Sequence, residues 1–88
     1  MSTSAPPSAT VTLRFFAGAS RAMGTRERTL PLDAPAPLEA VIARLGATGE
    51  AARVLGLCTW LVDTVPAEGG TPVAPGATVD ALPPFAGG

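Results

Sequence analysis

The segment that decides the fold is TVTLRFFA, residues 10–17. Every second side chain in it is apolar, which is the period of a β-strand with one buried face. The side chains expected to point inward are those of Val11, Leu13, Phe15 and Ala17. Phe16 is a large aromatic residue on the polar side of this pattern, and two interpretations of it stay open. Either a partner covers the ring, or the end of the strand twists it into a side pocket of the same core.

The residues that follow this first strand predict a hairpin. Residues 18–25 have glycine near both ends and are expected to form a connection, and residues 26–32 are expected to form a second strand with Leu30 and Leu32 inward. Neighbouring strands of this kind usually pair antiparallel.

A helix is expected next, because apolar residues recur at positions i, i+3, i+4 and i+7. These residues are Leu38, Val41, Ile42 and Leu45. The spacing is typical of an amphipathic helix, which Gly46 is expected to end. A second, shorter helical turn is predicted over residues 50–55.

The last third of the chain predicts further strands separated by turns. Residues 57–62 form an apolar run typical of a strand covered on both faces, and residues 63–64 can turn the chain. Pro75-Gly76 predicts another turn, after which residues 77–82 form a closing strand beside the first one.

This order of elements predicts an α+β fold of the β-grasp, or ubiquitin-like, type. The expected sheet is mixed and has four to five strands, with one main helix packed across one face. Three regions are expected: a disordered tail over residues 1–9, the β-grasp domain over residues 10–82, and a flexible functional tail over residues 83–88.

Composition limits what this domain can do. The chain has 88 residues, a net charge of −1, no histidine and a single cysteine, so it offers no histidine base, no His/Cys metal site and no disulfide framework. Six arginines against seven acidic residues give no basic field, which argues against a nucleic-acid partner. No apolar run approaches the ~20 residues of a membrane span, so no membrane partner is expected and the expected location is cytoplasmic.

The last six residues, PPFAGG, predict a functional terminus. The two prolines end the preceding strand because they cannot donate to a sheet ladder. Gly87 and Gly88 have no Cβ, so the walls of a partner's channel can approach the chain closely. A tail of this length spans at most about 20 Å. We therefore expect the α-carboxylate of Gly88 to be the functional group, carried into a partner's site.

Two segments resemble a known family, the small subunit of molybdopterin synthase (MoaD-type), within the ubiquitin-like sulfur carriers. They are residues 11–17 with Gly24, and residues 82–88, whose Pro-Pro-apolar-small-Gly-Gly pattern is the specific part. The resemblance covers roughly residues 10–88. Two turns depart from the family pattern, at residues 63–64 and 76–78.

The resemblance implies a chemistry that the partners perform. An E1-like adenylyltransferase (MoeB-type) would use ATP to adenylate Gly88, and a sulfur donor protein would convert it to a thiocarboxylate. The tail would then insert into the large subunit (MoaE-type), where the sulfur is transferred to a pterin precursor. The chain itself would be a non-catalytic, sulfur-donating subunit that binds no cofactor. The residues expected to bind partners are Phe16, Leu82, Pro83, Pro84, Phe85 and Ala86.

Three alternatives stay open at this point. The chain could be a sulfur carrier of thiamine or cysteine biosynthesis, or a ubiquitin-like modifier joined through Gly88 to lysines of other proteins. A β-grasp binding module without a covalent role is the third, and it predicts that Gly88 can be replaced without loss of function.

Overall fold

A computed structural model describes residues 9–84 of the chain. Its main feature is a five-stranded mixed sheet with strand order β2-β1-β7-β4-β5, and a small second sheet pairs β3 with β6. The strands are β1 (Thr10–Phe15), β2 (Glu27–Pro31), β3 (Ala36–Pro37), β4 (Thr59–Val62), β5 (Val65–Ala67), β6 (Pro72–Val73) and β7 (Thr78–Leu82). The helices are α1 (Gly18–Met23), α2 (Leu38–Ala43) and α3 (Gly49–Leu57).

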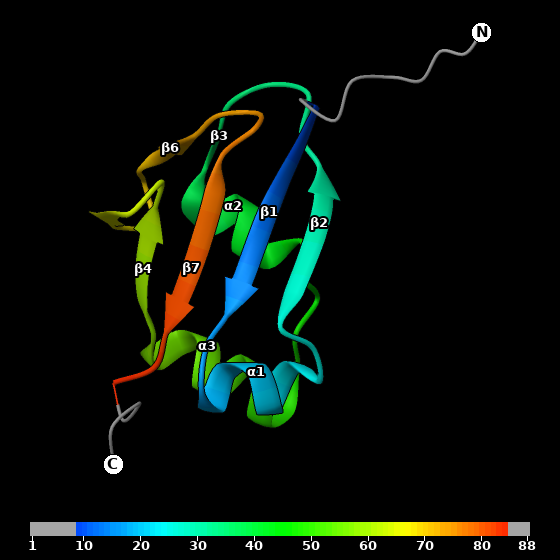
Figure 1. The fold of residues 1–88 in the computed structure, drawn as a ribbon, viewed down its shortest axis with the longest axis vertical. Coiled ribbons are helices and arrows are strands. Elements are labelled where there is room, and N and C mark those ends of the chain that lie inside the picture. Colours follow the sequence, from blue (N-terminus) through cyan, green and yellow to red (C-terminus); the bar gives the residue numbers. More distant parts are fainter. Residues whose placement is uncertain (1–8, 85–88) are drawn as a thin grey trace, which may run out of the picture.

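The helices leave one face of the large sheet open. Figure 1 shows α2 behind β1 and β7, with α1 and α3 grouped at the end of the sheet where β1 and β7 finish. We call the face turned toward α2 the inner face and the opposite one the outer face. This arrangement is the β-grasp fold that the sequence predicts, with α2 as the helix across one face.

The closing strand lies beside the first one, as predicted. β7 pairs with β1 in parallel and with β4 antiparallel, so it occupies the centre of the sheet. β1 and β2 form the predicted antiparallel hairpin. Because β1 and β7 are parallel, both strands end at the same edge of the domain (Figure 1).

The core lies between the inner face and the helices. The alternation in β1 is confirmed for Val11, Leu13 and Phe15, whose side chains are buried. They pack with residues of α2, β7 and the segments between them, and the largest fully buried side chains are Leu13, Leu38, Val11, Val41, Val73 and Val79. Burial of this apolar surface is the main force that holds the helices to the sheet.

The predicted connection over residues 18–25 is wrong in part, since six of these residues form α1. Ala17 is exposed rather than inward, and its φ of 50° turns the chain out of β1. Ala19 takes the buried position instead. A helix of one and a half turns is too short to produce a periodic apolar pattern, so the sequence carries no clear signal for it.

The third quarter of the chain also differs from expectation. α3 is the longer of the two later helices and includes Leu57, which is exposed, so β4 begins only at Thr59. The prediction that this strand is covered on both faces is wrong, because Trp60 is buried on the inner face while Thr59 is exposed. The turn at residues 63–64 is confirmed: both have positive φ, as a two-residue hairpin requires.

Among residues 9–84, no helix is long and apolar enough to cross a membrane. Residues 1–8 and 85–88 lie outside the described part, so the expectations for these two tails stay predictions.

Candidate docking face and exit of the terminal segment

The chain leaves the domain from the centre of the sheet. The backbone N–H of Phe16 donates to the carbonyl of Ala81 (3.2 Å), which ties the end of β1 to the end of β7. Leu82 is half-buried, Pro83 is buried and Pro84 is exposed. Since neither proline has an N–H to donate, the ladder stops here. The terminal segment therefore starts from a fixed point at the rim of the outer face.

The outer face is built from the alternate residues of the central strands. The β1–β7 register pairs Leu13 with Val79 and Arg14 with Asp80. The first pair is buried against the helices, so the second pair lies on the outer face. Leu61 is the β4 neighbour of Asp80 and shares that face.

Arg14 and Asp80 form a two-pronged ion pair at the middle of this face. Arg14 Nε lies 2.7 Å from Asp80 Oδ1, and Nη2 lies 3.0 Å from Oδ2. The Asp80 side chain is 7% exposed and that of Arg14 is 46% exposed. The hydrogen bond from Arg14 to Asp80, and then the carboxylate charge, raise the pKa of Arg14. Arg14 is thus paired within the domain rather than held free for a partner.

Phe16 lies on the outer face next to this pair. Its side chain is 38% exposed, and the Arg14 guanidinium carbon is 5.6 Å from the ring centroid. Of the two interpretations of Phe16, the structure favours the exposed one, because the ring is not inserted into a side pocket of the core. The cation over the ring orients it while leaving much of its surface open.

Apolar side chains surround the ion pair on this face. The β4–β5 register pairs Leu61 with Pro66. The β1–β7 register pairs Phe15 with Ala81, so the next residues along the two strands, Phe16 and Leu82, lie beside each other. We call this set the outer patch; its members are Phe16, Leu61, Pro66 and Leu82. Apolar and aromatic side chains are what a docking surface places at its core, and the charges of Arg14 and Asp80 neutralise each other within this patch.

Some of the predicted site residues come together and others cannot be placed. Phe16, Leu82, Pro83 and Pro84 all lie at the exit of β7. The remaining ones lie outside the described residues, and their roles stay predictions: Phe85, Ala86, Gly87 and Gly88.

Sequence reasoning missed Asp80 and Leu61 as members of this face. Arg14 stood on the polar side of its strand, which was a usable signal. However, its partner is identified only by the parallel register between two segments 66 positions apart. Residue patterns indicate that strands exist, and they do not fix such a register.

Cys58 offers no nucleophile to this site. Its thiol is half-buried on the inner side and donates to the carbonyl of Val54 (3.3 Å). Burial raises the pKa of this thiol, so it stays protonated near neutral pH.

Comparisons with known proteins give a consistent result at the level of structure. No family model and no curated protein matches the sequence. Small archaeal modifier protein 1 of Haloferax volcanii superposes with a TM-score of 0.69 at 19% identity, over 86% of this chain and 98% of that one. A putative molybdopterin converting factor, subunit 1, from Pyrococcus furiosus superposes with a TM-score of 0.69 at 15% identity. The match covers 86% of this chain and 98% of that one. In the complex of subunits 1 and 2 of molybdopterin-converting factor from Helicobacter pylori, the matching chain superposes with a TM-score of 0.66 at 22% identity. The match covers 90% of this chain and 99% of that one.

The chain therefore has the ubiquitin-like β-grasp fold, and the match covers nearly the whole of each neighbour. These neighbours include both molybdopterin converting factor subunits and small modifier proteins. They share the fold that the resemblance to MoaD-type, ubiquitin-like proteins implies.

Proposed function

We propose that this chain is a ubiquitin-like carrier protein whose Gly88 carboxylate is activated and loaded by partner enzymes. The observation that carries the proposal is the position of β7. The strand that leads to PPFAGG lies at the centre of the sheet, and its exit is fixed beside an exposed apolar patch. A partner that docks on the outer patch would receive the terminal segment in its own active site.

The more specific proposal is sulfur transfer as the small subunit of a molybdopterin synthase. It rests on the resemblance of residues 82–88 to that family and on the fold shared with two molybdopterin converting factor subunits. One of those neighbours was solved bound to subunit 2, which supports a large-subunit partner here.

The chemistry follows from the weakness of a carboxylate as an electrophile. Adenylation by an E1-like enzyme would convert the Gly88 carboxylate to an acyl-adenylate and release pyrophosphate from ATP. A donor of sulfide-level sulfur would then attack the acyl carbon and expel AMP, which leaves a thiocarboxylate whose sulfur is the nucleophile of the next step. Docking on the outer patch would supply the positioning, which is the carrier's own contribution.

Adenylation provides the test of this proposal. The chain is incubated with a MoeB-type enzyme, ATP and labelled pyrophosphate, and the return of label into ATP is measured. We expect exchange with the unaltered chain, and none when one alanine is added after Gly88, because the reacting carboxylate is then displaced from its position. We expect strongly reduced exchange for Gly87→Ala, since its Cβ would meet the walls of the channel.

The internal glycine pair offers a matched control. A Cβ added at Gly70 meets nothing within 4 Å, and Gly70 has no positive φ. Gly70→Ala should therefore leave exchange unchanged. Equal exchange for the extended and the unaltered chain would refute the proposal.

A second function, that of a protein modifier, is favoured by the likeness to small archaeal modifier protein 1. It needs the same adenylation but yields a different product. If incubation with a cell extract produces proteins of higher mass that contain this chain, the modifier function holds. The chain has no lysine, so such products would carry it singly rather than as polymers built on its own lysines.

A further inference from the structure

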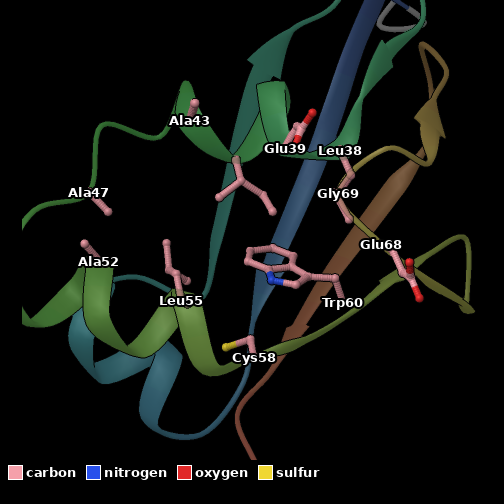
Figure 2. A pocket seen from close by; sticks show the side chains of 12 residues that line it. Leu38, Glu39, Ala43, Ala47, Ala52, Leu55, Cys58, Trp60, Glu68 and Gly69 are labelled. Carbon is pink, nitrogen blue, oxygen red and sulfur yellow. The ribbon is translucent and has the colours of Figure 1, made fainter.

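A cavity lies on the opposite side of β4 from the outer patch, between α2, α3 and the β5–β6 connection. Its volume is about 430 Å³, within the range of sites that bind small ligands. Leu38 and Ile42 of α2 and Leu55 of α3 form apolar walls. Figure 2 shows Trp60 between Leu38 and Leu55. Alanines at positions 43, 47 and 52 leave the space open where larger side chains would fill it.

Trp60 brings an unpaired hydrogen-bond donor into this cavity. The residue is 8% exposed, so more than nine-tenths of it is buried. Its indole N–H makes no hydrogen bond with any residue that the structure describes. In that part of the chain, every fully buried side-chain nitrogen has a hydrogen-bond partner, so the indole nitrogen is not fully buried. The indole nitrogen must therefore be accessible from the cavity that the ring lines, and Figure 2 shows it on the ring edge toward Cys58. The accessible indole N–H can therefore donate to an acceptor that a bound ligand supplies.

The lining of the cavity is acidic. Glu39 and Glu68 contribute carboxylates, and no arginine is among the lining residues. Both glutamates are exposed, and neither forms an ion pair with a residue of the described part of the chain. Two unpaired carboxylates beside an apolar hollow attract a ligand that is both apolar and cationic.

We propose that this cavity is a second docking site, which takes a short segment of a partner protein with a bulky apolar side chain beside an arginine or lysine. The apolar side chain would fill the space between α2 and α3, a backbone carbonyl would accept from the Trp60 N–H, and the cation would lie by Glu39 or Glu68 at the rim. The complementary charge is the reason to choose a basic segment as the occupant.

The site is independent of the proposed carrier function. Trp60 and Leu61 are adjacent in β4 and point to opposite faces of the sheet, so a segment bound at Trp60 leaves the outer patch free. The partner could thus be held while the terminal segment is loaded or delivered elsewhere.

The single tryptophan makes the test direct, because the indole N–H gives one resolved signal in a ¹H–¹⁵N correlation spectrum. The probe is an acetylated, amidated tetrapeptide with two leucines between two arginines, added to ¹⁵N-labelled full-length protein up to about 1 mM, the weak range expected of one pocket. We expect the indole signal to move downfield with saturation, together with the amide signals of Leu55 and Gly69. A peptide with glutamates in place of the arginines, and one with serines in place of the leucines, should produce no saturating shift.

Three variants sharpen the result. Glu39→Gln combined with Glu68→Gln should weaken binding several-fold and reduce its dependence on salt, whereas Glu27→Gln, on β2, should not change it. Ala52→Leu should fill the cavity and abolish the shift while the rest of the spectrum stays native. The proposal is overturned if the indole signal does not move, if the acidic peptide binds equally well, or if the shifts occur only at Phe16, Leu61 and other residues of the outer face. Because no variant touches the terminal glycines, failure here would leave the adenylation test unaffected.

Discussion

The two faces of the central strand pair β1 and β7 differ in what they do. On the inner face Leu13 and Val79 are fully buried, and their role is to hold the sheet to its helices. On the outer face, one residue further along each strand, Arg14 and Asp80 form an ion pair beside the exposed ring of Phe16. Stability, and in our proposal docking, thus fall to alternate residues of the same strands.

This difference has a practical consequence. In a small domain the buried apolar area is barely sufficient for stability, so little of it can be lost. Apart from the Arg14–Asp80 pair, the outer face can vary at a lower cost, because its side chains are not packed against a second layer. Substitutions on the two faces should therefore separate folding from binding.

The largest expected effect is on the inner face. Leu13→Ala removes a fully buried side chain between β1, β7 and α2, and should lower the free energy of unfolding by about 3 kcal/mol. Urea denaturation followed by circular dichroism measures this change. A loss below about 1 kcal/mol would mean that the centre of the core is packed loosely.

Phe16→Ser should affect partner binding more than it affects stability. Its ring is 38% exposed, so the free energy of unfolding should fall by about 1 kcal/mol, less than for Leu13→Ala. Affinity for the adenylating enzyme or the large subunit should fall about tenfold or more, because a central aromatic contact is lost. Calorimetric titration measures the affinity, and Leu57→Ser, another exposed apolar position on the helical side, is the control. Equal binding by both variants would remove the outer patch from the docking surface.

The ion pair should give a smaller, structural effect. Arg14→Ala leaves the buried Asp80 carboxylate without its partner, so it should lower the urea midpoint, though less than Leu13→Ala does. Asp80→Asn should lower it less, because Arg14 is half in solvent. The double variant should lose less than the sum of the two, as expected for groups in direct contact. Strict additivity would contradict a coupled pair.

The smallest effect is expected at Ala17, which lies in the connection between β1 and α1. Ala17 has a φ of 50° that alanine tolerates poorly, and its side chain is exposed. Ala17→Gly should raise the free energy of unfolding by up to about 1 kcal/mol, since relief of strain exceeds the added chain entropy. Thermal unfolding measures the gain, and a decrease would show that the Ala17 methyl group contributes to packing.

The sequence predicts the fold well where a pattern is long enough to repeat. The alternation around Leu13 and the spacing in α2 gave the sheet and its helix, and the position of the closing strand followed from chain connection rules. α1 was missed because it is too short for periodicity, and the β4 boundary moved because Leu57 suits a helix end as well as a strand.

The candidate site was only partly predictable, for a different reason. Phe16 was identified because it breaks the alternation of its own strand. The Arg14–Asp80 pair and the cavity at Trp60 depend on tertiary register and on empty space between elements. No local pattern encodes either of these.

The most direct test of the carrier function is the intact mass of the chain purified from cells that contain its natural partners. The proposal predicts a species about 16 Da heavier, as expected when sulfur replaces one oxygen. Fragmentation should place the added mass on Gly88, and alkaline hydrolysis should remove it. If only the unmodified mass is found, even after incubation with an E1-like enzyme, ATP and a sulfur donor, sulfur carriage by Gly88 is contradicted.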